Sequence, residues 1–434
     1  MNDFDIIIIG AGASGLMAAR KLSEAGKKTL VLEARERLGG RINTVTEVGF
    51  SSYIEAGAEF VHGRLSLTEA ILKEAEIGTY NMEGETYQVK HGAIIEQDSF
   101  IDDFSLLLSK IKELKEDMPF ALFLEKHLKE DKYKSLRESA RMYAEGYDAS
   151  DIKKVSSFAL REEWMSEASS MSYRLKGGYG KVISFLANRS VRSGAIIYHS
   201  TIVKEIRWQE GNVEVICSED KIYSSKKVII TVPLGVLQLK PDSPGSITFT
   251  PEISDTHNSL QHLGYGSVIK IFLEFKDPFW EGRTSFKGKV RKMPELDFVL
   301  SDALIPTWWT QMQGNRNLLT GWLAGPMAKK FQDESEETLI LKSLESLSYI
   351  FGTKQSFLLD HLAAKKAVNW ATDRFALGAY SYATVESKEA LKELTKPVKD
   401  TIYFAGEAFY EGAAMGTVEA ALSSALNAVK VLMQ

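Results

Sequence analysis

The stretch that decides the fold is Asp5-Ile-Ile-Ile-Ile-Gly10-Ala-Gly12-Ala-Ser-Gly15, close to the start of the chain. Residues 6–9 are wholly apolar and β-branched, which is the composition of a buried parallel strand. Residues 13–25 carry apolar side chains at helical spacing, and Gly26 follows as a stop signal. The sequence therefore predicts a strand, a glycine-rich turn and a helix in direct succession.

The three glycines of this turn have separate roles. Gly10 permits the tight turn, Gly12 lets the backbone approach a pyrophosphate, and Gly15 allows the helix to pack closely on the strand. Ala13 and Ser14 begin the helix, whose free backbone N–H groups favour an anion. These five residues are the predicted pyrophosphate site.

A second apolar strand at residues 29–32 ends in Glu33, 18 residues after Gly15. An acid at this distance accepts hydrogen bonds from the hydroxyls of an adenosine ribose. A lone glycine motif is weak evidence, but the two strands, the helix and the acid together predict FAD or NAD as the ligand.

The segment that follows Glu33 separates these two cofactors. It reads Glu33-Ala-Arg35-Glu-Arg-Leu-Gly39-Gly40-Arg41, and it resembles the extension found in FAD-dependent amine oxidases. That resemblance implies that Arg41 neutralises phosphate charge while the two glycines keep the backbone close to the pyrophosphate. A nicotinamide enzyme has no need of this segment, so FAD is the predicted cofactor.

The composition fits a large enzyme with two domains. The chain has 434 residues, of which 44% are hydrophobic, and its 53 basic and 58 acidic residues give a net charge of −5. No basic tract dominates, so no nucleic-acid partner is expected. Because the first strand begins by about residue 4 and no long apolar run occurs, we expect no secretory signal, no membrane span and a cytoplasmic location. The only cysteine, Cys217, is expected to be a strand packing residue.

The predicted fold class is α/β, with a discontinuous Rossmann-like FAD-binding domain and a second α+β substrate domain built on a mixed sheet. Strand-like segments within residues 196–232 and 401–407 return to the first domain after long insertions, and residues 65–188 are expected to be rich in helix. An amphipathic helix is predicted near residues 336–351. The predicted boundaries are 1–75, 190–247 and 371–434 for the FAD-binding domain, and 76–189 and 248–370 for the substrate domain.

Five ordered motifs extend over the length of the chain. They are the N-terminal fingerprint, Gly57-Ala-Glu-Phe-Val-His-Gly63, the run from Tyr265 to Trp280, Leu377-Gly-Ala-Tyr-Ser-Tyr382, and Phe404-Ala-Gly-Glu407 with Gly416-Thr-Val418. Together they resemble the flavin-containing amine oxidase family, which includes monoamine oxidases, polyamine oxidases and lysine-specific histone demethylases.

The resemblance implies further flavin contacts late in the chain. The turn that ends in Glu407 would contact the pyrophosphate and the ribityl chain, and the helix after Gly416 would point at the flavin pyrimidine. A helix dipole there stabilises the negative charge of a reduced ring. Val203 matches a position whose backbone contacts adenine in relatives. The residues implied in this way are Val203, Gly406, Glu407, Gly416, Thr417 and Val418.

Lys270 is the residue predicted to take part in the chemistry. It lies in the apolar run Val268-Ile-Lys-Ile-Phe-Leu273, where a charge is unfavourable unless it is satisfied. Strand alternation puts Lys270 on the same face as Val268 and Phe272. By pattern alone it fits an edge-strand lysine that reaches solvent. In the family, the matching lysine holds a water against flavin N5, and the resemblance favours that role here.

The substrate cavity is expected to be aromatic, because the chemistry needs a neutral amine and desolvation favours the neutral form. Tyr380 matches one wall of the family's aromatic cage, and Trp370 is expected to shape the same face. Trp308 and Trp309 either line the cavity or belong to the core. His62 matches a histidine of some polyamine oxidases, and is either a partner for a distal amine or a structural residue.

Two positions depart from the best-known members of the family. Ala379 stands where monoamine oxidases carry the cysteine that bonds to the flavin, so the FAD is expected to be non-covalent. Thr417 aligns with the second aromatic residue of the cage, which puts a preference for simple arylalkylamines in doubt.

The predicted function is that of an FAD-dependent amine oxidase with a small-molecule amine and O2 as its partners. Hydride passes from the carbon of a CH–NH group to flavin N5, O2 reoxidises the flavin to give H2O2, and water hydrolyses the imine to an aldehyde or ketone. The predicted catalytic residues are Lys270, Tyr380, Trp370 and His62, with no metal, in a monomer or homodimer. The alternatives are an FAD-dependent desaturase or oxidase acting on C–C bonds, and a flavin-binding redox sensor without amine turnover.

Overall fold

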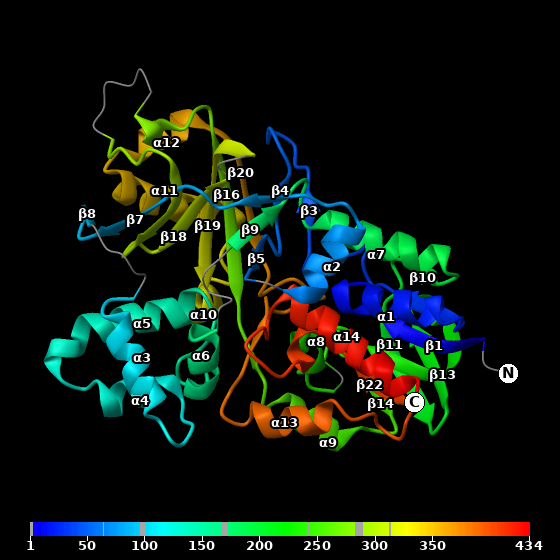
Figure 1. Ribbon diagram of the computed structural model, residues 1–434. Coiled ribbons are helices and arrows are strands. Elements are labelled where there is room, and N and C mark those ends of the chain that lie inside the picture. The colour runs from blue at the N-terminus through cyan, green and yellow to red at the C-terminus, as the bar shows by residue number, and fades with distance from the viewer. Residues whose placement is uncertain are drawn as a thin grey trace.

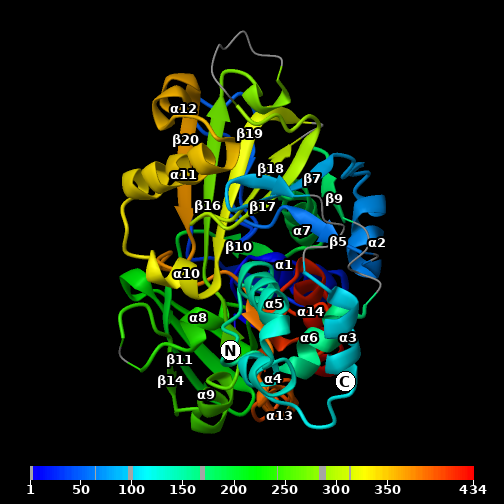
Figure 2. The same ribbon diagram turned by 90° about the vertical axis from the view of Figure 1, so that its left-hand side faces the viewer.

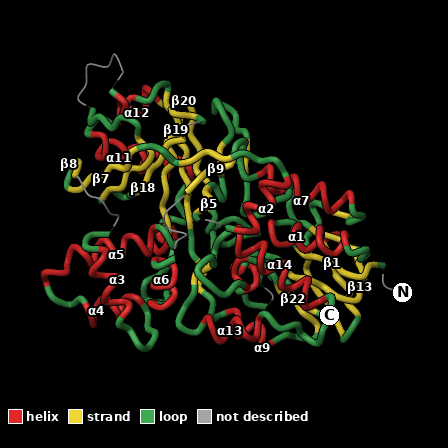
Figure 3. Tube along the Cα trace, in the orientation of Figure 1, coloured by secondary structure: helices red, strands yellow, loops and turns green. Residues whose placement is uncertain are grey.

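The computed structural model describes residues 3–63, 65–95, 101–166, 172–241, 243–282, 290–311 and 314–434. Figure 1 shows three parts: a sheet with helices packed against it, a second sheet with helices of its own, and a separate group of helices. Figure 3 shows the same division, because the strands concentrate in two regions while the third region is helical.

The first sheet joins strands from both ends of the chain and from its middle. Its strands are β1 (Phe4–Ile9), β2 (Thr29–Leu32), β10 (Ile196–Tyr198), β11 (Val203–Gln209), β12 (Asn212–Cys217), β13 (Ile222–Ile230), β14 (Thr248–Thr250) and β22 (Ile402–Phe404). Their order is β10-β2-β1-β13-β12-β11-β14, and β22 also pairs with β13. β1 runs parallel to both β2 and β13, and β13 runs parallel to β22. The predicted discontinuous α/β fold is therefore confirmed.

Helices cover both faces of the first sheet. On one face α1 (Ala13–Glu24), α7 (Gly180–Arg192) and α14 (Val418–Leu432) pack in a common core with side chains of β1. On the other face, α9 (Ser254–Leu260) and α13 (Ser387–Leu394) share a second core that includes Cys217. Cys217 is fully buried in β12, as the prediction of a packing residue requires.

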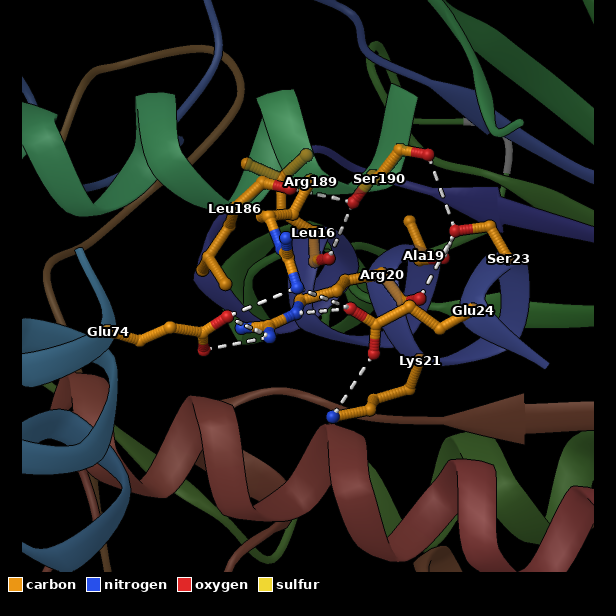
Figure 4. Close-up of polar contacts among 10 residues, drawn as sticks. All are labelled: Leu16, Ala19, Arg20, Lys21, Ser23, Glu24, Glu74, Leu186, Arg189 and Ser190. Atoms are coloured by element: carbon orange, nitrogen blue, oxygen red, sulfur yellow. Dashed lines mark hydrogen bonds and ion pairs between the residues drawn. The ribbon is translucent and has the colours of Figure 1, made fainter. Parts of the chain in front are cut away.

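A buried arginine fixes the direction of α1. Arg20 is 6% exposed, and its guanidinium pairs with Glu24 of the same helix at 2.9 Å and with Glu74 of α2 (Ser66–Glu74) at 2.7 Å. The hydroxyl of Ser190 in α7 donates to the carbonyl of Leu16 at 3.2 Å (Figure 4). Because a buried charge must be paired, these contacts hold α1 against α2 and α7, with the N-terminus of α1 toward the cavity described below.

The second sheet is mixed and mostly antiparallel. Its strands are β7 (Glu85–Lys90), β8 (Ala93–Ile95), β16 (Val268–Phe275), β17 (Leu296–Ser301), β18 (Thr307–Gln311), β19 (Asn315–Ala324) and β20 (Leu362–Asn369), in the order β20-β16-β19-β18-β17-β7-β8. α11 (Glu336–Phe351) and α12 (Gln355–His361) share a core with this sheet. The helix predicted near residues 336–351 is confirmed with the same bounds.

Part of this sheet comes from a region that was expected to be rich in helix. β7 and β8 lie within residues 65–188, and β7 pairs in parallel with β17. β7 reads Glu-Thr-Tyr-Gln-Val-Lys, and only Gln88 and Val89 in it are buried. The sequence of such a polar strand shows little alternation of apolar and polar residues, so the strand is hard to predict from its own residues. It forms through its pairing with β17.

A group of four helices forms the third part of the molecule. These are α3 (Phe104–Lys112), α4 (Phe120–His127), α5 (Lys134–Gly146) and α6 (Ser157–Trp164). Their shared core contains Phe120, Phe123 and Trp164, and Figure 2 turns this group toward the viewer. Ser156 caps α6 by accepting a hydrogen bond from the backbone N–H of Ala159 at 3.0 Å.

Short elements connect these three parts. They are β3 (Thr44–Val45), β4 (Ile54–Glu55), β5 (Phe60–His62), β6 (Thr79–Asn81), β9 (Ser172–Leu175), β15 (Gly264–Tyr265), β21 (Ser381–Tyr382), α8 (Leu234–Leu237) and α10 (Gly325–Lys330). Within the described part of the chain, no helix is long and apolar enough to cross a membrane.

Candidate active site

One cavity of about 1610 Å³ reaches all three parts of the molecule. Its walls include the turn between β1 and α1, the start of α14, the inner end of β16, and the helices α5 and α6. The cavity brings together nineteen predicted site residues from distant parts of the chain, sixteen of which are Gly10, Gly12, Ala13, Ser14, Glu33, Arg35, Gly39, Gly40, Arg41, Val203, Lys270, Trp370, Tyr380, Glu407, Gly416 and Thr417. The other three are Gly406, Val418 and His62.

The glycine-rich turn after β1 has the geometry of a phosphate cradle. Gly10 has a φ of +104°, and a Cβ on Gly15 would lie 1.9 Å from the carbonyl oxygen of Gly10. Gly15 is thus required for packing and is the one predicted pyrophosphate residue that does not line the cavity. The described atom nearest to a Cβ built on Gly12 would be the carbonyl oxygen of Gly39, at 3.9 Å. The backbone at Gly12 therefore faces open space.

Ser14 gives a direct test of whether this cradle fits a phosphate. Its hydroxyl lies in the first turn of α1, is buried, and has no hydrogen-bond partner among the described residues. A buried hydroxyl without a partner is unfavourable. A phosphate at the helix N-terminus would satisfy it together with the free backbone N–H groups, so the residues present fit the diphosphate of a dinucleotide.

Glu33 stands at the end of β2 and is 5% exposed. Its two carboxylate oxygens accept hydrogen bonds from the backbone N–H groups of Ala11 at 2.8 Å and Arg35 at 2.9 Å. A carboxylate has about four acceptor positions, so capacity remains for ribose hydroxyls. The Arg35 side chain is itself held by Asp373, at 2.9 Å from Nη1 to Oδ2.

Arg41 and Glu407 form an ion pair in the cavity wall. Nη1 of Arg41 lies 2.6 Å from Oε1 of Glu407 and donates to the carbonyl of Ala379 at 2.8 Å. Ser381 donates to the other oxygen of Glu407 through its hydroxyl. Burial by itself lowers the pKa of Arg41, but the neighbouring Tyr265 and Glu407 outweigh this effect and raise it. The guanidinium is therefore a permanent cation, and the phosphate contact remains a prediction.

The N-terminus of α14 closes the same end of the cavity. Thr417 caps this helix, since its hydroxyl accepts a hydrogen bond from the backbone N–H of Ala420 at 3.2 Å. The same hydroxyl donates to the carbonyl of Ala414 at 2.6 Å. The Thr417 side chain thus has a local structural role, and the alignment that places it in the aromatic cage remains untested.

Lys270 is buried in the middle of the second sheet. β16 lies between β20 and β19, so the interpretation as an edge-strand lysine is wrong. The side chain is 1% exposed, and Nζ donates to the carbonyl of Glu55 at 2.7 Å, the carbonyl of Gly57 at 3.2 Å and a carboxylate oxygen of Glu59 at 2.8 Å. An ammonium has three donors, and these contacts use all of them.

Glu59 connects Lys270 to a wider network. It is 5% exposed and also accepts hydrogen bonds from Nε of Arg174 and Nε1 of Trp309, both at 3.0 Å. Burial by itself raises the pKa of Glu59, but Lys270 and Arg174 outweigh it and hold the pKa below its usual value. Glu59 is therefore ionised, and it was missed as a functional residue although it lies inside the quoted Gly57 to Gly63 motif.

Aromatic side chains line the cavity next to this network. Tyr380 and Trp370 both contribute, and the indole N–H of Trp370 donates to the carbonyl of Ala56 at 2.8 Å. The two candidate tryptophans of β18 separate: Trp309 lines the cavity, whereas Trp308 is fully buried in the core against Gly321. Alternation along the strand explains this difference.

His62 lines the cavity with a neutral ring. Its Nδ1 lies 2.8 Å from the hydroxyl of Ser172, and its ring packs edge-on against Tyr147 with 5.5 Å between the centroids. Burial lowers the pKa of His62 to about 4. The ring is therefore neutral near pH 7, and its role toward a distal amine remains a prediction.

Comparison with known proteins decides the family. The model of the family described as flavin-containing amine oxidoreductase matches residues 13–433. The chain belongs to this family. Probable polyamine oxidase 4 of Arabidopsis thaliana is 26% identical over 99% of this chain and 88% of its own length. Lysine-specific histone demethylase 1 homolog 3 of the same plant is 25% identical over 94% of this chain, which spans only 28% of that relative.

A solved structure of a putrescine oxidase bound to putrescine shows the same fold. It matches 99% of this amine oxidoreductase chain and 99% of its own chain with a TM-score of 0.81, at 19% sequence identity. The cofactor of the present chain, as a member of the flavin-containing family, is FAD. The turn between β1 and α1, Glu33 and the start of α14, which are the features predicted to hold FAD, all line the cavity. Each of these features lies within a motif that was visible in the sequence.

Proposed function

We propose that the protein is an FAD-dependent oxidase that converts an amine and O2 into an imine and H2O2, and that the imine is then hydrolysed. The observation that carries the proposal is the single cavity in which the dinucleotide cradle, the buried Lys270 and an aromatic wall meet. The family membership and the polyamine oxidase relative support amine chemistry. The bound FAD would supply the two-electron chemistry.

The residues of the chain would prepare the substrate. The rings of Tyr380, Trp370 and Trp309 line the cavity, and burial of an alkylamine against them would favour its neutral form. Lys270 would hold a water that assists reoxidation of the flavin by O2 and hydrolysis of the imine. Because the bond from Nζ to the Gly57 carbonyl is the longest of its three, this is the bond that such a water would replace.

FAD would be held without a covalent bond. Ala379 has no nucleophilic side chain, and its carbonyl is engaged by Arg41. The purified protein should therefore be yellow, and acid precipitation should leave the flavin in the supernatant. Flavin that stays in the washed pellet would contradict this part of the proposal.

A substrate panel tests the reaction class. FAD-loaded protein is mixed with amines, amino acids and polycyclic alkenes, and flavin bleaching without oxygen and peroxide release with oxygen are measured. Turnover of an amine supports the proposal. Turnover of alkenes alone would show a C–C oxidase, and no turnover of any compound would show a flavin-binding sensor.

Lys270→Met then tests the part played by the lysine. Methionine keeps the length of the side chain and removes its nitrogen. We expect FAD to remain bound and reoxidation by O2 to slow at least about tenfold, which corresponds to roughly 1.4 kcal/mol of barrier. Reduction by the amine should change less. Reoxidation at the wild-type rate would mean that Lys270 only supports the structure.

A further inference from the structure

One buried carboxylate in the cavity wall binds side chains from several strands. Glu59 lies between β4 and β5, and its Oε2 accepts a hydrogen bond from Nζ of Lys270 in β16 at 2.8 Å. Its Oε1 accepts hydrogen bonds from Arg174 of β9 and Trp309 of β18, both at 3.0 Å. Glu59, Lys270 and Trp309 line the cavity. A single carboxylate therefore holds both the lysine of the proposed reaction and a ring of the cavity wall.

Arg174 holds this carboxylate from the other side. Its Nη2 donates to the carbonyl of Thr310 at 2.9 Å. Its Nη1 lies 3.7 Å from Oδ1 of Asp297, which is 4% exposed. The planar guanidinium is therefore fixed by a backbone carbonyl and a second buried carboxyl in addition to Glu59. Because Arg174 is anchored in this way, Glu59 is kept in position toward Lys270.

The hydrogen-bond partners of Lys270 are all acceptors. Nζ contacts the backbone carbonyls of Glu55 at 2.7 Å and Gly57 at 3.2 Å, as well as the carboxylate of Glu59. An ammonium has three donors and no acceptor, so it matches these three oxygens. A neutral amine has only two N–H groups, and its lone pair would face one of the oxygens, which leaves a buried acceptor without a donor. The geometry therefore requires the ammonium form of Lys270.

Two aromatic rings near Nζ also favour a cation. Nζ of Lys270 lies 5.3 Å from the centroid of the Trp309 ring and 5.4 Å from that of the Phe272 ring. The faces of aromatic rings attract a cation. The indole N–H of Trp309 donates to Glu59, so the carboxylate that pairs with the ammonium also keeps this ring beside it.

We propose that Glu59 is a positioning residue that keeps Lys270 as an ammonium at a fixed place in the cavity wall, so that the lysine acts as a permanent cation and hydrogen-bond donor and never as a base. This inference rests on the proposed oxidase function. A water that replaced the bond to the Gly57 carbonyl would accept from Nζ and would therefore direct its own hydrogens into the cavity. A fixed cation stabilises negative charge that develops nearby during the reduction of O2.

The first experiment observes the ammonium directly and needs no turnover. The FAD-loaded protein is prepared with heavy nitrogen in its lysine side chains, and NMR spectra are recorded at mildly alkaline pH. The protons of exposed ammonium groups then exchange with water too fast to be seen, whereas those of a buried, hydrogen-bonded ammonium persist. We expect an ammonium signal in the wild-type protein that is absent from Lys270→Met. If the signal that Lys270→Met removes is that of a neutral amine, or if no signal is removed, the proposal is overturned.

Variants of Glu59 test whether its charge maintains the ammonium. Glu59→Gln keeps the shape of the side chain and removes the charge, and Glu59→Asp keeps the charge. Glu274→Gln is the matched control, because Glu274 is a 4% exposed carboxylate in the same strand as Lys270, accepts from the backbone N–H of Ser51 at 3.1 Å and does not line the cavity. The ammonium signal should disappear in Glu59→Gln and persist in the other two variants. A signal that persists in Glu59→Gln, or is lost in Glu59→Asp as well, would count against the proposal.

The second experiment asks whether Glu59 acts through Lys270. Each holoenzyme is reduced anaerobically with dithionite and mixed with O2, and the rate of flavin reoxidation is measured. Glu59→Gln should slow this step at least about tenfold, and the double variant with Lys270→Met should stay within about threefold of Lys270→Met alone. Glu59→Asp should recover most of the wild-type rate, and Glu274→Gln should not change it. A double variant that loses the product of the two single effects would show that Glu59 acts independently of the lysine.

These measurements separate the failure of this inference from the failure of the proposed function. Neither of them uses an amine, so a protein that oxidises no amine in the substrate panel would refute the proposed function and still report on Glu59. If Glu59→Gln does not retain FAD, the comparison of the wild-type protein with Lys270→Met and the behaviour of Glu59→Asp decide the outcome.

Discussion

Replacement of Lys270 with Met should lower the free energy of unfolding, because the substitution leaves the buried carboxylate of Glu59 with one cationic partner instead of two. Loss of one member of a buried ion pair destabilises a protein by about 3–5 kcal/mol. Arg174 still binds Glu59 at 3.0 Å, and Trp309 still donates to it, so we expect about 3 kcal/mol. The apolar pattern of β16 alone suggests the opposite. By that pattern, removal of an unfavourable polar group from an apolar strand should leave the free energy of unfolding unchanged or raise it.

The assay is urea denaturation of the FAD-loaded protein, followed by flavin and tryptophan fluorescence, for Lys270→Met, Glu59→Gln and the double variant. The loss of stability in the double variant should be smaller than the sum of the two single losses by at least about 1.5 kcal/mol. Lys276→Met is the control, because Lys276 is exposed just after the same strand, and a change within about 0.5 kcal/mol is expected there. If the two single losses add up to the loss in the double variant to within about 0.5 kcal/mol, the reasoning is refuted.

Three further predictions concern cofactor, substrate and pH. Glu33→Ala should weaken FAD binding by about 1.5–3 kcal/mol, or roughly 10- to 150-fold in Kd by equilibrium titration; an unchanged Kd would show that the ribose contact is wrong. Tyr380→Ala should reduce amine turnover while the ratio of FAD to protein stays normal, and loss of FAD would instead indicate a folding role. Burial raises the pKa of Glu55 to about 7 from 4.5. A raised pKa favours the folded state while the group is protonated, so stability should fall as the pH rises from about 4.5 to 7, by about 3 kcal/mol at 1.36 kcal/mol per pKa unit. Glu55→Gln should remove this slope in denaturation curves, and a slope that persists would exclude Glu55 as its source.

Local signals predicted the cofactor end of the molecule well. The Gly10 to Gly15 turn, the strand that ends in Glu33 and the helix after Gly416 each depend on residues that are near one another in the sequence. Backbone conformation at a glycine and the capping of a helix are short-range effects. The same holds for α11, whose bounds follow from its apolar spacing and from Ser335, which accepts a hydrogen bond at its start.

The substrate end depended on tertiary packing and was predicted only in part. Lys270 was found because its charge interrupts an apolar run, but its partner Glu59 is 211 positions away, and nothing local indicates that the two meet. Asp148, which follows α5, and Glu163 of α6 also line the cavity, although they lie in a region dense in charged residues, where acids usually belong to solvated helical faces. Their position in the cavity wall results from the packing of α5 and α6, which composition does not reveal.

The position of β22 beside β13 has a consequence for the biogenesis of the enzyme. These neighbours are more than 170 positions apart, and the helix that completes the flavin end comes later still. At about 5–20 residues per second, a ribosome needs roughly ten to thirty seconds to synthesise the chain between them. During this interval the Gly10 turn has already emerged, whereas the strand that will flank β13 does not yet exist. Tight capture of FAD therefore has to wait until β22 and α14 have been synthesised, and until then one side of β13 lacks its native neighbour.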